Sequence, residues 1–414
     1  MYFYCFSRYS SSMSKSSTHL LHVNQRPWCS TLVIGFLVLL AQSALGQNVA
    51  SPASPLNNKG VPVSQMPHLS IQRVFIYTPV TEWTYSHHAS ITHFKDLWVA
   101  TWSNGHVNED NPGQRVLYTT SRDFFHWTPP QVLAAPGMSP TGTENILTAA
   151  GFHQFGDTLV AYYGEYDVNR KHTHLWAKTS TDGHTWGPAL DMHMPVNPNL
   201  GPAKIASGRL IISGNYTLPY TDDPTGLRGW KMSSFYPADS AFQLEDNPAT
   251  FGTAARKLKL PALCETSFFQ TDDQVLHAMF RVTGRPLTGF LYEAESDDNG
   301  EHWTRPVLTS FTNKDSKFDF GRLPDGRFFY VGNSDTARTA DRNPLVISTS
   351  TNGVDFNKSY IIADKVYQMK KPGKSKGGQY GYPTTVIYRG KVYVIVSREK
   401  EAVEVIRFDI SQLK

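Results

Sequence analysis

Short runs of alternating apolar and polar residues dominate this chain. Residues 85–127 (YSHHASITHFKDLWVATWSNGHVNEDNPGQRVLYTTSRDFFHW) hold three such runs, and each run ends in polar or turn-forming residues. Alternation with a period of two, broken by turns, is typical of successive antiparallel strands. Helical periodicity is absent, and the first clear strand lies near Ile71, in IQRVFIYTP. The pattern predicts an all-β fold.

A turn motif recurs after several of these runs. Its form is Ser/Thr-x-Asp-(x)-Gly-x-x-Trp, with clear copies at residues 180–186 and 296–303 and looser copies at 121–127 and 350–356. The first serines of successive copies are 59, 116 and 54 residues apart. Because 116 is twice 58, we expect one unit to have lost its motif, near residues 230–242. A repeat of this length carrying about four strands is the signature of a propeller blade.

The residue types of the motif suit a tight turn. Asp or Asn accepts backbone N–H bonds within the turn, Gly tolerates a positive φ, and Trp packs between strands. We therefore interpret the motif as scaffold and predict a β-propeller of four-stranded blades. The strand near Ile71 would complete the last blade and close the ring. Six units are counted from the box spacing, with starts near His88, Phe152, Pro198, Glu265, Phe318 and Tyr382.

The first 46 residues have the pattern of an export signal. An apolar run at residues 31–44 follows a leader without acidic residues, and Ala44-Leu-Gly46 offers the small residues of a cleavage site. The run is shorter than the about 20 residues that a bilayer span needs, so no stable span is expected after cleavage; an uncleaved signal anchor is the alternative. We expect residues 47–68 to be a linker and residues 69–414 to form a single β-propeller catalytic domain. The protein should then be secreted or periplasmic.

Charge and cysteine content narrow the class of protein. The net charge of +4 is small for 414 residues, and no basic stripe favours a nucleic acid as partner. Cys264 is the only cysteine after the predicted signal, so an internal disulfide cannot form. The domain must be held by its apolar core.

His87 and His88 begin a strand that the repeat pattern makes an inner strand. Inner strands of a propeller converge on its axis, so residues at their starts meet there. Strict alternation would send the two side chains to opposite faces, with His88 on the more polar one. Histidine can take and return a proton near neutral pH, which makes His88 the candidate base. A hydrogen-bonded core histidine is the alternative interpretation.

Further polar candidates occupy equivalent places on other blades. Arg281 and Arg342 could clamp a carboxylate, because the planar guanidinium meets two oxygens at once; an ion pair within the fold is the alternative for each. The set contains no pair of acidic residues, whereas glycoside hydrolysis usually needs two carboxylates. It favours the removal of a proton beside a uronate carboxylate. The remaining candidates are Asn104, His106, Tyr163, Tyr380 and Tyr382.

Several runs resemble a known family. The turn motif is similar to the aspartate-box (BNR) repeat of sialidase-like propellers, which indicates a fold more than a function. The His-His pair, the run WSNGHVNEDNPGQRV, the segments CETSFFQ and HAMFR, and the tail GGQYGYPTTVIYRGKVYVIVSREKEAVEVIRF resemble secreted propellers that degrade polysaccharides. That family cleaves L-rhamnose α-1,4-linked to D-glucuronate. Its members are described as α-L-rhamnosidases or as lyases, and they are related to propeller ulvan lyases.

The resemblance implies a site and partners. It implies seven blades, where the box spacing gives six, and a catalytic histidine at His87 or His88. The resemblance implies that the second histidine and the tyrosine of ulvan lyases correspond to His106 and Tyr163. The expected partner is an acidic polysaccharide or oligosaccharide. No cofactor is expected to be required, and the resemblance allows a structural calcium ion near the axis.

Three functions follow from these patterns. The first is an exported lyase that cleaves the rhamnosyl-glucuronate linkage by β-elimination, with His88 or His87 as base and Arg281 neutralising the uronate carboxylate. The second is a hydrolase, either an α-L-rhamnosidase or a sialidase-like exo-glycosidase. Against a sialidase, the sequence shows no arginine in an FRIP-like setting near the first strand and no convincing arginine triad. The third is a non-catalytic propeller that binds carbohydrate.

Overall fold

The computed structural model describes residues 54–59, 62–215, 217–235, 263–283, 288–334 and 341–414. All of them belong to one compact unit, residues 52–414, and the predicted export signal lies outside the described residues. Within these ranges the chain forms strands and two short 3-10 turns, η1 (Val63–Gln65) and η3 (Ile410–Gln412), but no α-helix. The prediction of an all-β fold is confirmed. No helix in this part of the chain is long and apolar enough to cross a bilayer.

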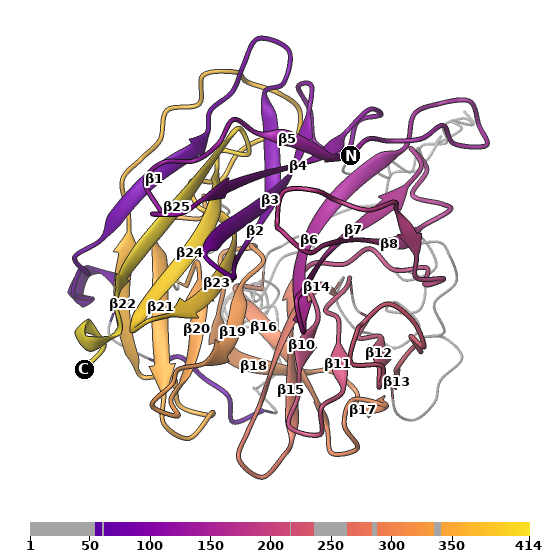
Figure 1. The fold of residues 1–414 in the computed structure, drawn as a ribbon. Helices are drawn as coiled ribbons and strands as arrows, with labels where there is room; N and C mark the ends of the chain where they lie inside the picture. The colour runs from indigo at the N-terminus through magenta and orange to yellow at the C-terminus, as the bar shows by residue number, and fades with distance from the viewer. Residues whose placement is uncertain (1–53, 60–61, 216, 236–262, 284–287, 335–340) are drawn as a thin grey trace, which may run out of the picture. The chain divides into compact units, whose positions relative to one another are not determined.

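Most strands belong to four-stranded antiparallel sheets (Figure 1). Two of these sheets are formed by β2 (Tyr85–Phe94), β3 (Leu97–Gly105), β4 (Arg115–Ser121) and β5 (Gln131–Ala134), and by β6 (Ile146–Phe155), β7 (Thr158–Tyr166), β8 (His174–Ser180) and β9 (Leu190–Asp191). Two more are formed by β14 (Leu263–Gln270), β15 (Leu276–Val282), β16 (Phe290–Ser296) and β18 (Val307–Thr312), and by β19 (Asp319–Arg322), β20 (Phe328–Gly332), β21 (Leu345–Ser350) and β22 (Lys358–Ala363). The last contains β23 (Gly381–Tyr388), β24 (Lys391–Arg398), β25 (Ala402–Asp409) and β1 (Gln72–Tyr77).

A smaller sheet lies in the chain between the β6–β9 sheet and the sheet that begins with β14. It consists of β10 (Ala203–Lys204), β11 (Leu210–Ile211) and β12 (Tyr220–Thr221). Beside it, β13 (Ser234–Phe235) pairs in parallel with β17 (His302–Trp303). The described residues thus contain five four-stranded sheets and one three-stranded sheet. The counts of six and of seven blades both stay predictions.

The first strands of the sheets surround a common axis. β2 packs against both β6 and β23, and β19 packs against both β14 and β23. The circle continues through the small sheet, because Thr148 on β6 donates a hydrogen bond to Asn197 at 2.5 Å, Pro198 pairs with Gly214, and Asn215 pairs with Glu265 on β14. The inner strands therefore close a ring, as in a β-propeller.

The ring is completed by pairing the first strand with the last. β1 runs antiparallel to β25, from Gln72 opposite Arg407 to Tyr77 opposite Val403. The prediction that the strand near Ile71 closes the last blade is confirmed. The joint also has a buried ionic centre, in which the Glu404 carboxylate accepts hydrogen bonds from Arg73 and Arg398.

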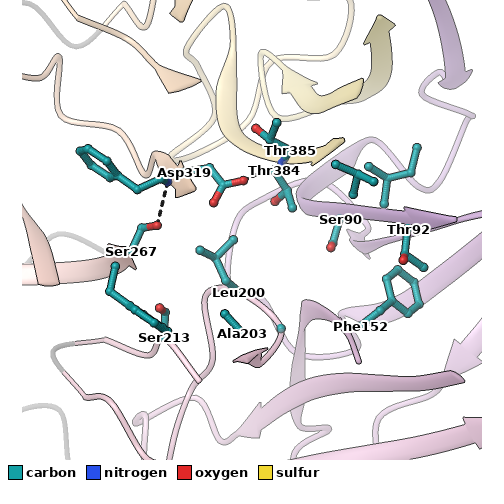
Figure 2. Close-up of a pocket in the computed structure, with 15 residues that line it drawn as sticks. Ser90, Thr92, Phe152, Leu200, Ala203, Ser213, Ser267, Asp319, Thr384 and Thr385 are labelled. Atoms are coloured by element: carbon teal, nitrogen blue, oxygen red, sulfur yellow. Dashed lines mark hydrogen bonds between the residues drawn. The ribbon is translucent and has the colours of Figure 1, made fainter. Parts of the chain in front are cut away.

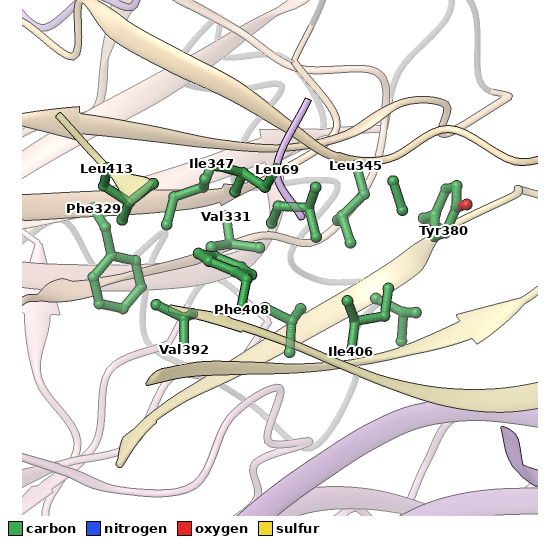
Figure 3. Close-up of a cluster of buried hydrophobic side chains, with 14 of the residues drawn as sticks. Leu69, Phe329, Val331, Leu345, Ile347, Tyr380, Val392, Ile406, Phe408 and Leu413 are labelled. Carbon is green, nitrogen blue, oxygen red and sulfur yellow. The ribbon is translucent and has the colours of Figure 1, made fainter. Parts of the chain in front are cut away.

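The apolar core lies between neighbouring sheets. Figure 3 shows one cluster, between the β19–β22 sheet and the β23–β25 sheet, in which branched aliphatic and aromatic side chains interlock. Alternate residues of each strand contribute, as the period-two pattern of the sequence requires. The cluster includes Phe329, Val331, Leu345, Ile347, Val392, Ile406 and Phe408.

The turn motif follows the third strand of its sheet. In the copy at 180–186, the Asp182 carboxylate accepts N–H bonds from His184 (2.8 Å) and Thr185 (2.7 Å), and Ser180 Oγ accepts one from Gly183 (2.8 Å). Gly183 has a φ of 76°, which side chains disfavour. The motif is therefore a self-satisfied turn, as its residue types predicted.

A turn of the same kind follows the small sheet. After β12, Asp223 Oδ1 accepts the N–H of Thr225 at 2.8 Å, and Gly226 takes a φ of 69°. Trp230 Nε1 donates to Gly226 O at 2.9 Å. This turn spans residues 221–230, whereas residues 236–242 of the segment expected to have lost the motif lie outside the described residues.

Part of the segment predicted to be a linker packs onto the sheets. Leu56 is buried in an apolar cluster with residues of the β14 and β19 sheets. Asn58 hydrogen-bonds Thr312 at 3.0 Å and Ser334 at 2.5 Å, and Ser54 donates to Glu293. Its serine and asparagine residues suit this role, because their side chains can donate and accept hydrogen bonds to the neighbouring strands.

Candidate active site

Bulges at the starts of inner strands aim side chains toward the axis. The register shifts by one extra residue in β2 at 87–90, in β14 at 263–266 and in β23 at 381–384. Within the first and last of these, His88 and Tyr382 have φ values of 52° and 55°. A bulge leaves the extra residue unpaired and turns its side chain to a new direction, which is why bulges recur beside functional sites.

The bulge in β2 overturns the expected alternation of the two histidines. The rings of His87 and His88 both lie against Tyr382, with centroid distances of 4.0 and 5.3 Å, and 4.6 Å from each other. The prediction that they face opposite sides of the strand is wrong, because the left-handed conformation at His88 interrupts the pleat. His87 Nδ1 contacts Ser397 Oγ at 2.6 Å, and His88 Nδ1 contacts Ser103 Oγ at 3.1 Å.

Tyr382 is hydrogen-bonded to a buried carboxylate. Its hydroxyl donates to Glu265 and also accepts a hydrogen bond from Arg281 Nη1 at 2.7 Å. Arg281 Nη1 lies 2.7 and 2.9 Å from the two oxygens of Glu265, and its Nε donates to Asp315 at 2.8 Å. The Arg281 guanidinium is therefore occupied by two carboxylates of the protein itself.

These contacts determine whether Tyr382 or Glu265 carries the proton at neutral pH. Burial alone would raise the pKa of the Glu265 carboxyl, but the Arg281 charge and the Tyr382 hydroxyl outweigh it and lower that pKa to about 2. Burial raises the pKa of the Tyr382 hydroxyl well above its usual value, although Arg281 acts against this. At neutral pH the proton belongs to Tyr382, and Glu265 is an ionised acceptor placed to receive it.

Arg342 is a cation of the site with a guanidinium N–H group that no described residue accepts. It precedes β21, has a φ of 55° and is 6% exposed. Its guanidinium carbon lies 5.1 Å from the ring centroid of Tyr382. Within the described ranges its Nη1 is buried without a hydrogen-bond partner. A buried cation with an unsatisfied N–H group is costly unless a ligand completes it.

Two lysines add positive charge around the imidazoles. Lys317 Nζ donates to Asn199 O at 2.9 Å and lies 5.8 Å from the Tyr382 ring centroid. Lys400 Nζ donates to Glu109 at 2.6 Å. Burial lowers the pKa of His88 to about 4, against the effect of nearby carboxylates, and burial likewise lowers the pKa of His87 well below its usual value. Both imidazoles are neutral at physiological pH.

His87, His88 and Glu109 could each direct one ligand atom to a common point, since these atoms lie within 4.8 Å of one another. Calcium prefers six to eight oxygen ligands, whereas two of these three donors are imidazole nitrogens. The carboxylate is already paired with Lys400. The residues at this end of the axis therefore do not fit a calcium ion.

The structure brings together five of the residues that the sequence singled out: His87, His88, Arg281, Arg342 and Tyr382. The other four lie elsewhere. The exposed His106 ring stacks on Trp83 at 4.0 Å. Asn104 is buried, with its amide donating to Tyr85 O at 3.0 Å and accepting from Arg115 at 3.0 Å. Tyr163 packs in an apolar cluster between two sheets, and Tyr380 donates to Lys365 O at 2.9 Å within the core.

Sequence reasoning missed Glu265, Lys317, Lys400 and Glu109. Glu265 had a usable signal, because it stands at the start of an inner strand, the position that singled out His88 and Tyr382. The two lysines and Glu109 lie outside the strands, in segments that border β19, β25 and β4. Their convergence depends on loop paths that the alternation of strands does not encode.

The closed ring of antiparallel sheets and the box turns after the third strands define a sialidase-like β-propeller. The chain belongs to the BNR repeat-like domain family, whose model matches residues 100–394. No curated protein matches the sequence closely enough to count as a relative.

Solved structures show the same fold. A protein described as "Sialidase" has a TM-score of 0.58 and 14% identity, over 88% of this chain and 35% of its own. Trypanosoma rangeli sialidase in complex with sialic acid has a TM-score of 0.57 and 14% identity, over 84% of this chain and 60% of its own. For the K499G mutant of NanB sialidase from Streptococcus pneumoniae the values are 0.52 and 13%, over 86% and 72%. The chain thus spans about a third to three fifths of the first two structures.

Proposed function

We propose that this chain is a carbohydrate-active enzyme that hydrolyses the glycosidic bond of a carboxylate-bearing sugar, with Tyr382 as nucleophile. One observation carries the proposal: the Tyr382 hydroxyl is hydrogen-bonded to the buried Glu265 carboxylate beside two arginines on the axis of the ring. A nucleophile within reach of a base, with the base oriented by a third group, is the general signature of covalent catalysis. Sialidases are the glycosidases that use tyrosine for this step.

The hydrogen bond between Tyr382 and Glu265 suggests the first chemical step. Tyr382 Oη forms a bond to the anomeric carbon while the bond to the leaving oxygen breaks, and Glu265 takes the hydroxyl proton. Because the pKa of Glu265 is about 2 and that of Tyr382 is raised, the proton must move together with the attack and not before it. The leaving oxygen takes its proton from solvent, because His88 is neutral and the Glu109 carboxylate is paired with Lys400. Water then cleaves the glycosyl-tyrosine and the proton returns to Tyr382.

Carboxylate recognition is assigned to Arg342. Its buried Nη1 is unsatisfied within the described residues, and Lys317 and Lys400 add positive charge nearby. Guanidinium groups bind carboxylates through paired N–H bonds. Arg281, the residue expected to do this from the sequence, already holds Glu265 and Asp315, so its role here is to keep Glu265 ionised.

The comparisons are compatible with this choice of substrate class but do not carry it. The T. rangeli sialidase, which shares the fold, is described in complex with sialic acid, a sugar with a carboxylate. The likeness extends to the fold alone at 14% identity. The substrate is therefore argued from Arg342 and the lysines.

A second candidate is β-elimination at a rhamnosyl-glucuronate linkage. It is favoured by the two neutral imidazoles against Tyr382, because the pKa of His88, about 4, leaves its ring free to take a proton at neutral pH. His88 would remove the proton next to the uronate carboxylate, Arg342 would neutralise that carboxylate, and Tyr382 would protonate the leaving oxygen.

One pair of assays distinguishes hydrolysis from β-elimination. The purified protein is incubated with a fluorogenic sialoside and with a rhamnosyl-glucuronate oligosaccharide, while released sugar and the ultraviolet absorbance of an unsaturated uronate are followed together. Hydrolysis releases sugar without absorbance and is lost in Glu265→Gln. Elimination releases rhamnose with rising absorbance and is lost in His88→Ala. Sugar binding without either product would contradict both and leave a carbohydrate-binding propeller.

We also propose that the protein acts outside the cytoplasm, in the secreted or periplasmic space. The support is the apolar run at residues 31–44 behind an acid-free leader, followed by small residues. An acidic polysaccharide substrate suits that location. Mass spectrometry of the protein recovered outside the cell would show a new N-terminus near residue 47 and would contradict the proposal if residue 1 were retained.

A further inference from the structure

A pocket opens at the other end of the axis from the candidate active site. Figure 2 shows Asp319, Ser267 and Ser213 on one side of it and Ser90, Thr384 and Phe152 on the other. Its volume is about 190 Å³. Pockets that hold drug-sized ligands have roughly 300–1,000 Å³, so this one fits a single sugar ring and not a chain.

The pocket is built by the same strands as the active site, two residues further along each. Ser90 follows His88 on β2, and Ser267 follows Glu265 on β14. Lys317 lies between the two ends, because its Nζ is 3.4 Å from Thr384 Oγ1 in the pocket and 5.8 Å from the Tyr382 ring centroid in the active site. The buried lysine therefore borders both ends of the axis.

The floor of the pocket carries hydrogen-bonding groups that the protein leaves unused. Ser90 and Ser213 are buried, and their hydroxyl groups have no partner among the described residues. Ser267 Oγ accepts the N–H of Phe320 at 3.0 Å and keeps its own O–H to donate. Asp319 is 8% exposed and accepts the N–H of Thr385 with one oxygen at 2.6 Å, which leaves the other oxygen to the pocket. Three donors and one strong acceptor converge on a small space.

The walls of the pocket are apolar. Phe152, Leu200, Phe268 and Phe320 surround the polar floor. The wall between β6 and the next segment is tight, because a Cβ on Gly151 would lie 2.7 Å from Gly201 N. Apolar faces around a few convergent polar groups are the usual anatomy of a small-molecule site, and sugar rings present apolar C–H faces and polar edges together.

Charge selects the kind of ligand. The Asp319 carboxylate repels a uronate or any other anion, and the Lys317 ammonium at the border of the floor repels a cation. The single carboxylate is also far short of the oxygen set that calcium prefers. We propose that this pocket is a second carbohydrate site that binds one neutral sugar residue, distinct from the catalytic end of the axis.

Calorimetric titration of the full protein with D-galactose, L-rhamnose, L-arabinose and D-galacturonate tests the proposal. At least one neutral sugar should bind, and its heat should depend on Ser213 and Asp319, whereas any heat from the galacturonate at the catalytic end should not. Ser213→Ala and Asp319→Asn should each weaken that binding about tenfold, since each removes a hydrogen bond to the sugar. Ser213→Ala is the cleaner variant, because its hydroxyl serves no other part of the described fold.

A matched variant at the other end of the axis separates the two sites. Tyr382→Phe should leave the binding of the neutral sugar unchanged while it abolishes turnover. The proposal is overturned if no neutral sugar binds to the wild-type protein, if Ser213→Ala and Asp319→Asn bind as tightly as wild type, or if Tyr382→Phe removes the binding. Because the readout is binding and not turnover, a failure of the proposed hydrolysis would not affect it.

Discussion

The two ends of the axis are made from the same inner strands and yet present opposite chemistry. At one end, His88 and Glu265 lie among arginines and lysines against Tyr382. Two residues further along the same strands, Ser90 and Ser267 line a pocket of hydroxyl groups. A strand sends every second side chain to the same face, so one ring of inner strands builds two sites in series. The difference between them is set by bulges and by single charges, not by the fold.

Charge placement explains what each end can select. The catalytic end holds Arg342 with an unsatisfied donor, whereas the far pocket is lined by one carboxylate, Asp319. Lys317 borders both ends and belongs to neither ion-pair network, since its Nζ bonds are to Asn199 O and Thr384 Oγ1. The first end is therefore suited to an acidic sugar and the second to a neutral one. Substitutions at each end test this contrast.

The largest effect is expected at the Tyr382–Glu265 pair. Tyr382→Phe and Glu265→Gln should each lower kcat by about 10²–10⁴-fold, because they remove the nucleophile or its base. Tyr380→Phe is the matched control: this tyrosine is two residues away but donates to Lys365 O within the core. Steady-state rates with far-ultraviolet circular dichroism would check both. Full activity of Tyr382→Phe would show that Tyr382 is not the nucleophile and would contradict the assignment of this end of the axis as catalytic.

A smaller effect is expected at Arg342. Arg342→Gln should raise KM for an acidic substrate by about 10–100-fold, since it removes a charged hydrogen bond, and should change little for the methyl ester of that substrate. Arg122→Gln serves as control, because Arg122 is exposed and pairs with Asp96 on the surface. An equal rise in KM for the acid and for its ester would show that Arg342 stabilises the fold and does not bind the substrate carboxylate.

Lys317 should link the two ends through pH. Burial lowers the pKa of Lys317 to about 8, against the effect of Asp319 and Glu265. Above that pH the lysine becomes neutral and no longer stabilises negative charge developing on Tyr382, so the rate should fall about tenfold as pH rises through 8. In Lys317→Met the rate should be low throughout and should lack this step. A step that persists in the variant would have to be assigned to another group. The measurement is a pH–rate profile from about pH 6 to 10.

The smallest effect contrasts the titration of the two ends. His88 has a folded pKa of about 4, below its ordinary 6.5, so its contribution to stability is lost as pH falls from about 6.5 toward 4. Burial raises the pKa of Asp319 from 3.8 to about 6, against the effect of Lys317, so its contribution is present at low pH and is lost as pH rises from about 4 through 6.

Urea unfolding at pH 7 and pH 5.5 measures this contrast. Relative to wild type, His88→Gln should gain and Asp319→Asn should lose about 1 kcal/mol of unfolding free energy on going to the lower pH. Shifts of the same sign in the two variants would contradict the assignment of opposite titrations. The difference between the two pH values is the quantity compared, because each substitution also has a pH-independent effect on packing.

The fold could be predicted from the sequence because its signals are local. The motif at 180–186 satisfies its own hydrogen bonds within a few residues, and the alternating runs fix which side chains enter the core. The turn at 221–230 was not recognised, because its Asp223 and Gly226 are three residues apart, whereas Asp182 and Gly183 are adjacent. The hydrogen bonds within a turn can be predicted from its residue types, whereas the spacing of the turns along the chain is harder to predict.

The site could be predicted only in part. Position at the start of an inner strand was enough to single out His88 and Tyr382, and it would have found Glu265 as well. The directions of the side chains were not predictable, because alternation fails at a bulge and the left-handed residue at His88 has no glycine to announce it. The occupation of Arg281 by Glu265 and Asp315 depends on contacts 16 and 34 residues apart in the chain.

The joint between β1 and β25 has a consequence for how the chain is made. Arg73 and Glu404, which meet at this joint, are separated by 331 residues, so the strand synthesised first must wait for the one synthesised last. Until then the nascent protein is an open arc with two bare strand edges, the kind of surface that invites pairing with a neighbouring chain. The pairing of β1 with β25 therefore acts as a check on synthesis, because the sheet can be completed only after β25 has emerged.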